Sequence, residues 1–194
     1  MATMKPQTQP FPKNAALISI DVQKAFDDPS WGSRNNPEAE SNIARLLEAW
    51  RKTGRPLFHI QHRSRASGSL FGPESPGFEI KDAAKPHADE PVIQKNVNSA
   101  FIGTDLEERL KQNELKTVVL IGLTTDHCVS TTARMAGNLG FETYVVADAT
   151  ATFDRVGPDG RSYKAEDVYA VNLASLNGEF ATVVDTEELL KRLK

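Results

Sequence analysis

The sequence predicts an α/β fold in which six mainly parallel strands form one sheet with helices on both of its faces. Short runs of apolar and β-branched residues, without polar alternation, are typical of strands that are buried on both faces. These runs alternate with segments of helical periodicity, and such alternation favours right-handed strand–helix–strand crossovers. The predicted strands are residues 15–20, 56–61, 92–95, 117–121, 142–147 and 181–184.

Length and composition indicate a single globular domain. The chain has 194 residues, of which 39% are apolar and 25% charged, and we assign one domain to residues 15–194. Residues 1–14 are polar and contain several prolines, which predicts a flexible arm, and no segment like a signal peptide follows. The formal net charge is −3, with neither a basic block nor an apolar run long enough to cross a bilayer. We therefore expect a cytoplasmic protein with no nucleic-acid and no membrane partner.

In the first half of the chain, each predicted strand leads into a helix or a loop. The run 15–20 ends at Asp21, and residues 37–52 then carry apolar side chains at helical spacing, with Gly54 as a C-cap. After the second strand, residues 63–90 lack periodicity and are rich in Gly, Pro and Ser. A segment of that length without regular structure is typically a functional lid or a covering loop.

The second half continues the alternation. Thr104 followed by Glu107 forms a capping-box pattern, which predicts a helix to about Gln112. The fourth strand leads into a helix that ends near Gly140. Beyond the fifth strand, the sequence predicts a loop and two helices, over residues 154–163, 166–176 and 186–193.

The single cysteine, Cys128, lies at the turn between the strand 117–121 and the following helix. The first N–H groups of a helix have no internal partner, and the macrodipole places partial positive charge there. A thiolate at this position is stabilised, so we expect a thiol pKa below the free value of about 8.5. The alternative is a small buried apolar residue, which is the usual role of a lone cysteine.

Four residues that could carry chemistry follow predicted strands: Asp21, Lys95, Cys128 and Asp148. Ligand sites of parallel sheets lie beyond the carboxyl ends of the strands. A thiol nucleophile needs a base and a positive partner, and Asp21 and Lys95 could supply them. The alternatives are a helix-capping role for Asp21 and a solvated edge charge for Lys95. Backbone N–H groups in the turn between Gly122 and Cys128 could form an oxyanion hole.

Three motifs together resemble the isochorismatase-like cysteine hydrolase superfamily, which includes nicotinamidases and N-carbamoylsarcosine amidohydrolase. They are Leu17-Ile18-Ser19-Ile20-Asp21-Val22-Gln23, Val92-Ile93-Gln94-Lys95 with Ser99-Ala100-Phe101, and Gly122-Leu123-Thr124-Thr125-Asp126-His127-Cys128-Val129. The resemblance implies a three-layer α/β/α sandwich and an Asp21–Lys95–Cys128 catalytic triad. It also implies a cis peptide at Leu123–Thr124, an oxyanion hole from the N–H groups of Thr124 and Cys128, and a homo-oligomer, either a dimer or a tetramer.

The chain departs from the nicotinamidase pattern at the metal site. Nicotinamidases carry an Asp followed two residues later by a His after the second strand, and His62 and Ser64 occupy those positions here. One histidine is not a chelating set, and His59 is expected on the opposite face of the strand from His62. We therefore expect no metal and no cofactor, and nicotinamide is a doubtful substrate.

The resemblance implies hydrolysis of a small-molecule amide or ureide through a thioester. The pocket could be lined by Phe26, Trp31, Phe101 and Phe153, with Phe101 favoured because it follows Lys95 closely; the alternative for each, and the more usual role, is a core residue. Loop arginines could bind a substrate carboxylate, although they are more often plain surface charges; they are Arg63, Arg65, Arg155 and Arg161. Two alternatives stay open: an isochorismatase-type vinyl-ether hydrolase that does not use the thiol, and a catalytically silent domain that binds a metabolite.

Overall fold

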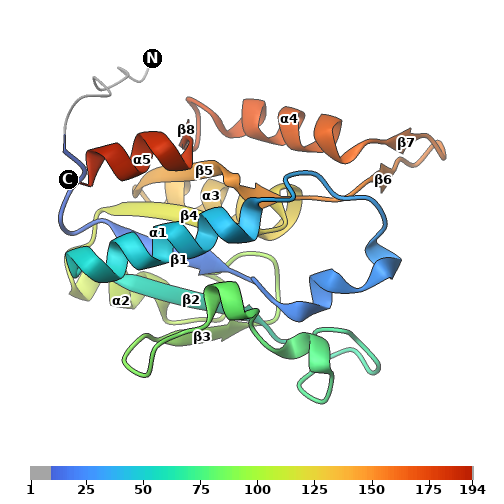
Figure 1. The fold of residues 1–194 in the computed structure, drawn as a ribbon, viewed down its shortest axis with the longest axis horizontal. Coiled ribbons are helices and arrows are strands. Elements are labelled where there is room, and N and C mark those ends of the chain that lie inside the picture. Colours follow the sequence, from blue (N-terminus) through green and yellow to red (C-terminus); the bar gives the residue numbers. More distant parts are fainter. Residues whose placement is uncertain (1–9, 194) are drawn as a thin grey trace.

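The computed structural model describes residues 10–193 and confirms the predicted α/β fold (Figure 1). Its main sheet has six strands, all parallel, in the order β3-β2-β1-β4-β5-β8. These strands are β1 (Ala16–Ile20), β2 (Leu57–His62), β3 (Val92–Lys95), β4 (Thr117–Leu123), β5 (Glu142–Ala151) and β8 (Thr182–Val184).

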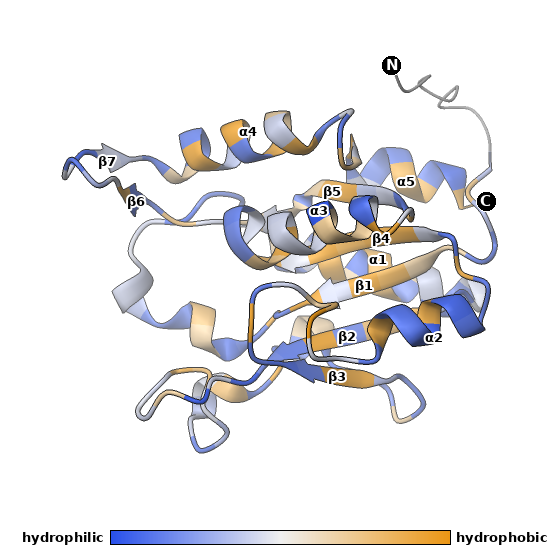
Figure 2. Ribbon diagram, turned by 180° about the vertical axis from the view of Figure 1, so that it is seen from behind, coloured by the Kyte–Doolittle hydropathy of each residue, from blue (hydrophilic) through white to orange (hydrophobic). Residues whose placement is uncertain are grey.

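Helices cover both faces of this sheet and produce three layers (Figures 1 and 2). On one face lie α1 (Ala39–Thr53) and α5 (Thr186–Arg192), whose Trp50 and Leu189 belong to one apolar core. On the other face lie α2 (Leu106–Gln112) and α3 (Ser130–Asn138), which contribute to a second core. A further helix, α4 (Ala165–Leu176), packs against α3.

The two central strands, β1 and β4, have every residue buried. They pair in register from Ala16 opposite Val118 to Ile20 opposite Gly122. Because both faces of these strands are covered by helices, the continuous apolar runs seen in the sequence are what this position requires. The carboxyl end of β1 is therefore held rigidly beside the end of β4.

The fifth strand is longer than predicted, and this corrects the expectation for Asp148. β5 continues to Ala151 after a shift in its register with β4. Asp148 lies within the strand, where its Oδ1 accepts hydrogen bonds from the N–H (2.9 Å) and the Oγ1 (2.8 Å) of Thr186. It also accepts a bond from Asn42 Nδ2 through its backbone oxygen, at 3.0 Å. Asp148 thus ties β5 to α5 and α1, away from the strand ends.

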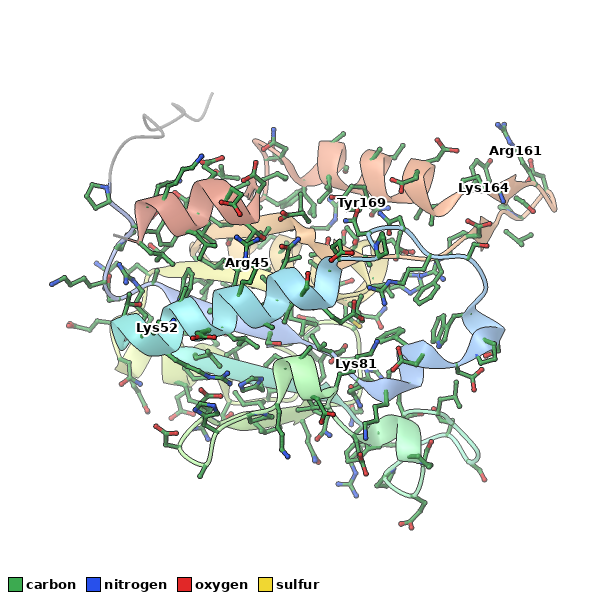
Figure 3. All side chains as sticks on the ribbon, in the orientation of Figure 1. Arg45, Lys52, Lys81, Arg161, Lys164 and Tyr169 are labelled. Atoms are coloured by element: carbon green, nitrogen blue, oxygen red, sulfur yellow. The ribbon has the colours of Figure 1, made fainter. Side chains whose placement is uncertain are left out.

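The predicted loop at 154–163 contains a short antiparallel hairpin of β6 (Arg155–Val156) and β7 (Ser162–Tyr163). Together with the start of α4, this hairpin extends beyond the body of the domain, where Arg161 and Lys164 mark it in Figure 3. The fold therefore places a small two-stranded unit between β5 and α4, which the glycine-rich sequence did not predict.

The long segment 63–90 contains two short 3-10 turns, η3 (Pro76–Phe78) and η4 (Asp82–Ala84). Between them Lys81 is buried, and its ammonium contacts Asp27 Oδ1 at 2.5 Å and Glu40 Oε1 at 2.8 Å (Figure 3). The same ion-pair cluster holds the 3-10 turn η1 (Lys24–Asp27), which is followed by η2 (Pro29–Trp31). This part of the segment is anchored to α1 and to the turn that follows β1.

The arm predicted for residues 1–14 lies largely outside the described residues. Within the described part, Phe11 is buried, its N–H donates to Arg192 O at 2.7 Å, and its ring contacts Trp50 and Tyr144. Residues 11–14 therefore belong to the folded domain, because an aromatic side chain buried in this way stabilises the core. Over residues 10–193, the structure contains no helix that is both long and apolar enough to span a bilayer.

Candidate active site

Asp21, Lys95 and Cys128 lie together at the carboxyl edge of the sheet. Lys95 Nζ is 2.6 Å from Asp21 Oδ2 and 3.3 Å from Cys128 Sγ. All three side chains are buried, so the ammonium and the carboxylate are shielded from water. Asp21 follows β1, Lys95 ends β3, and Cys128 lies in the turn that follows β4, as the strand-end argument predicts.

The backbone around Asp21 is fixed by the neighbouring strands. Asp21 has a φ of 50°, and its N–H donates to Ile60 O at 2.9 Å. Opposite the preceding residue, Ile20, Gly122 has a φ of 118°, and a Cβ at that position would lie 2.0 Å from Ile20 O. Only glycine permits this approach of β4 to the end of β1. Asp21 is thereby placed beside the turn that carries Cys128.

Cys128 lies in a π-helical turn, η5 (Thr125–Val129), and α3 begins after it at Ser130. The prediction that Cys128 lies in the first turn of an α-helix is therefore corrected. Thr124 O accepts hydrogen bonds from the N–H groups of His127 and Val129, both at 3.2 Å. The peptide bond between Leu123 and Thr124, where the resemblance implies a cis bond, is cis in the structure.

The thiol pKa of Cys128 is raised, which reverses the expectation from the helix macrodipole. Burial raises the pKa most, the Asp21 carboxylate raises it further, and the Lys95 ammonium offsets only part of this. Burial is the main cause, and because Asp21 is paired with Lys95, the ammonium leaves little positive charge to stabilise a thiolate. The resting site therefore holds a neutral thiol beside a carboxylate–ammonium pair.

One oxygen of Asp21 is uncommitted. Oδ2 accepts from Lys95, whereas Oδ1 is buried and has no hydrogen-bond partner within residues 10–193. An unsatisfied buried acceptor costs free energy, so it indicates a site where a proton or a ligand is received. Potential ligand atoms of Asp21, His62 and Cys128 lie within 4.8 Å of one another, so the carboxylate of Asp21 is close to the thiol.

A small cavity of about 170 Å³ opens onto these residues, roughly the volume of six water molecules in the liquid. Asp21, Thr124 and Cys128 lie at its polar end. Aromatic side chains form its apolar wall, and the lining includes Phe26, Trp31 and Phe71. A cavity of this size and composition fits a small, partly apolar molecule.

The structure separates the predicted pocket aromatics into three groups. Phe26 and Trp31 line the cavity, and Phe153 lies against them, with ring centroids 6.0 Å and 5.3 Å away. Phe101 is the exception and corrects the prediction, because its ring stacks on Phe141 in the core at 5.8 Å. Closeness to Lys95 in sequence therefore did not place Phe101 in the cavity.

Four lining residues were not predicted as site residues: His62, Phe71, Asn98 and His127. His62 is the last residue of β2, so the strand-end rule could have found it had the strand been extended by one residue. Asn98 Oδ1 is 3.8 Å from Cys128 Sγ and follows Lys95 closely. Phe71 comes from the long segment 63–90, whose path no local pattern reveals.

The loop arginines lie outside the small cavity. Arg155 binds Asp126 in a bidentate manner, with its Nε 2.7 Å from Oδ2 and its Nη2 3.1 Å from Oδ1. Arg161 lies over the Tyr163 ring in the hairpin. Arg63 and Arg65 line a separate, larger cavity of about 920 Å³. Of the two roles, the structure favours a structural one for Arg155, because Asp126 already occupies its guanidinium.

The residues at this edge fit a metal ion poorly. Asp21, His62 and Cys128 are a possible ligand set, but Lys95 Nζ lies within hydrogen-bond distance of all three. A metal cation bound by the three would lie next to this ammonium, and the two positive charges would repel each other. The Lys95 side chain already supplies positive charge at the centre of the cluster.

Comparisons with known proteins agree with this fold and site. Residues 15–188 match the isochorismatase domain. An uncharacterized isochorismatase family protein of Bacillus subtilis, YrdC, is 54% identical over 175 residues, which cover 90% of this chain and 94% of that protein. Nicotinamidase 3 of Arabidopsis thaliana is 29% identical over 197 residues, covering 95% of this chain and 91% of that protein.

A crystal structure of a Chromobacterium violaceum protein, described as a hydrolase of the isochorismatase family, is similar over almost the whole chain. It is 43% identical, covers 98% of each chain and superposes with a TM-score of 0.94. The matched domain includes all the strands that carry Asp21, Lys95 and Cys128. The chain therefore belongs to the isochorismatase family, and it is a hydrolase of that family.

Proposed function

We propose that the protein is a cysteine hydrolase that cleaves an amide or ureido C–N bond of a small molecule through a thioester. The observation that carries this proposal is the position of the Lys95 ammonium, which contacts both Asp21 Oδ2 and Cys128 Sγ. A base, a positive partner and a nucleophile thus meet at one cavity. Nicotinamidase 3, a relative whose name denotes an amide-cleaving enzyme, supports the same bond type.

The first step forms the thioester. Asp21 Oδ1 takes the Cys128 proton as sulfur attacks the carbonyl carbon, so the thiolate develops only next to Lys95. The N–H groups of Thr124 and Cys128, both at the cavity, receive the oxyanion. Asp21 then gives the proton to the leaving nitrogen, the C–N bond breaks, and the amine departs.

The second step releases the acid. Asp21 deprotonates a water molecule, which attacks the thioester carbonyl, and the proton returns to sulfur as the C–S bond breaks. The products are an amine and a carboxylic acid, or a carbamic acid when the substrate is a ureide. The raised thiol pKa is compatible with this cycle, because a free thiolate is never needed in the resting enzyme.

The test uses primary amides and ureides of a size that fits the cavity. Wild-type enzyme should release ammonia and show an acyl adduct on Cys128 by mass spectrometry after acid quenching. Cys128→Ala should lose at least about a thousandfold in turnover while keeping the fold, since nucleophile removal in comparable enzymes costs more than this. Cys128→Ser is the matched control for the size of the side chain.

Two other outcomes would contradict the proposal. Turnover of a vinyl-ether substrate by Cys128→Ala would favour acid catalysis by Asp21, without the thiol. Tight binding of a small molecule by wild-type protein, with no product and no adduct, would favour a silent binding domain.

A further inference from the structure

The His62 ring is held in one place at the end of β2. Its backbone N–H donates to Gln23 Oε1 at 2.7 Å, and its carbonyl accepts from Gln23 Nε2 at 3.0 Å. Gln23 is fully buried, and its amide also donates to Phe78 O at 2.9 Å. The imidazole ring itself packs edge-to-face against the Phe71 ring, with the two ring centroids 5.4 Å apart. The orientation of His62 is therefore set by the fold.

The tautomer of His62 follows from the neighbouring ammonium. Lys95 Nζ has three protons and no lone pair, and it has three neighbours that can accept. These are Asp21 Oδ2 at 2.6 Å, Cys128 Sγ at 3.3 Å and His62 Nδ1 at 3.2 Å. Since Nδ1 must accept from Lys95, it carries no proton. A neutral imidazole in this arrangement carries its hydrogen on Nε2.

The charge state of His62 agrees with this geometry. Burial lowers the pKa of His62, and the positive charge of Lys95 lowers it further, while Asp21 opposes them. The titratable groups that face the ring are Lys95 from β3, Asp21 after β1 and Cys128 in the π-helical turn. At neutral pH the imidazole is therefore uncharged.

The Nε2–H group has no acceptor within residues 10–193, and the ring lines the small cavity. The one carboxylate at that cavity, Asp21, is neutralised by Lys95. The other polar side chains that line the cavity are neutral or exposed: the amide of Asn98, the hydroxyl of Thr124 and the imidazole of His127. Neutral donors at a cavity without an unpaired cation favour a neutral oxygen over a carboxylate, because a buried carboxylate needs a cationic partner to offset its desolvation.

We propose that Lys95 locks His62 as the neutral Nε2–H tautomer, and that this N–H binds a carbonyl oxygen of an uncharged substrate beside the scissile C–N bond. The assignment makes His62 a specificity residue and narrows the substrate class to small uncharged amides or ureides with a second carbonyl. It rests on the proposed function for the identity of the scissile bond. The tautomer itself is independent of that function.

Two substitutions separate the two nitrogen atoms of the ring. His62→Asn keeps an acceptor near the position of Nδ1 for Lys95 but removes the donor at Nε2. His62→Gln places an amide N–H near the position of Nε2 but removes the ring acceptor. A purely structural role would affect both variants without regard to the ligand.

The first measurement determines the tautomer of His62 in the full-length wild-type protein. Its histidines are labelled with ¹⁵N, and the tautomer is read from two-bond ¹H–¹⁵N correlations at pH 7.5. The His62 signals are assigned by their absence in His62→Gln. We expect the Nε2–H pattern, and an Nδ1–H pattern or an imidazolium would overturn the proposal.

The second measurement is ligand binding in a Cys128→Ala background, so that no probe is consumed. Malonamide has a second carbonyl and butanamide does not. Each is titrated into the protein, and binding is followed by the NMR signals of His127, which also lines the cavity. We expect malonamide to bind about three- to tenfold more tightly, the factor that one neutral hydrogen bond supplies. His62→Gln should retain this preference and His62→Asn should lose it.

The absence of a malonamide preference, or its persistence in His62→Asn, would overturn the role of His62. Failure of the proposed function would look different, because it would appear as turnover by Cys128→Ala in the absence of an acyl adduct. The tautomer and the probe preference would survive that result.

Discussion

At the residue scale, the chemistry depends on one buried cation with several partners. Lys95 is almost fully buried and is held between the carboxylate of Asp21, the sulfur of Cys128 and the ring of His62. A buried ion pair adds little net stability, but removing one partner leaves an uncompensated charge in the interior. The cation is therefore needed for the fold around the site as well as for the proposed catalysis.

We expect Lys95→Met to lower the free energy of unfolding by about 3–5 kcal/mol, because Asp21 would be left as an unpaired buried carboxylate. Urea denaturation measures this loss. The double variant Asp21→Asn/Lys95→Met should recover most of the stability and remain inactive. A double variant as unstable as the single one would show that the ion pair is not the cause.

A second residue-scale prediction concerns Asp126 beside the cysteine turn. Burial raises its pKa, but hydrogen bonds from Arg155 and Thr152 outweigh burial and bring the pKa down from 3.8 to about 2. A lowered pKa stabilises the fold above the unfolded value, and the contribution is lost as pH falls through the folded value. The stability advantage of wild type over Arg155→Met should therefore shrink between pH 4 and pH 2, as measured by denaturation at several pH values. An advantage that is constant over this range would contradict the assignment.

The sequence predicted most of the reactive groups but not all of the cavity. Asp21, Lys95 and Cys128 follow apolar runs, so the strand-end rule and the motifs found them. Phe71 and Asn98 line the cavity from loops, and the spacing of residues along the sequence does not predict the path of a loop. Phe101 shows the converse error, because a residue near Lys95 in sequence turned into the core.

At the element scale, the close contact of β1 and β4 positions the site. A Cβ on Gly122 would collide with the backbone of β1, which cannot move without shifting Asp21. We expect Gly122→Ala to destabilise the protein by about 3 kcal/mol or more and to abolish turnover. Thermal unfolding and ammonia release measure the two effects.

Gly54 supplies the matched control for this substitution. It also has a positive φ, of 63°, but a Cβ there would meet no atom within 4 Å. Gly54→Ala should lower the free energy of unfolding by only about 1–2 kcal/mol, which is the cost of a left-handed backbone for a residue with a Cβ. Turnover should be unchanged. Equal losses in both variants would mean that backbone conformation, and not the contact with β1, explains the effect at Gly122.

Element boundaries followed the sequence where burial was uniform and departed from it where polar residues interrupt a run. β1 and β4 are continuous apolar segments, and their predicted bounds agree closely with the structure. β5 continues past Asp148 because Thr186 and Asn42 satisfy the polar groups of Asp148 inside the sheet. Such long-range partners are absent from any local pattern, so the sequence predicted an end there.

At the scale of the whole molecule, self-association stays a prediction, and the projecting part of the structure offers a place to test it. Val171 on α4 is 68% exposed and Val156 in the hairpin is 73% exposed. Contiguous exposed apolar patches mark contact surfaces, so the question is whether these two side chains contribute to one. We expect Val171→Lys to shift a dimer or tetramer towards monomer in sedimentation velocity.

Ile102 is the control for that experiment, because it is 51% exposed and lies in the turn before α2 on another part of the surface. Ile102→Lys should leave the sedimentation coefficient unchanged. A monomeric wild-type protein, or equal dissociation by both variants, would contradict an interface through α4.

The central place of β1 also has a consequence for how the chain folds during synthesis. One neighbour of β1, β2, is synthesised soon after it, at Leu57–His62, but the other neighbour, β4, begins only at Thr117. At about 5–20 residues per second, translation leaves the inner edge of β1 open for about 5–20 s. During that interval the nascent chain presents an unpaired apolar strand, so the half-made sheet is the stage at which a chaperone would be most useful.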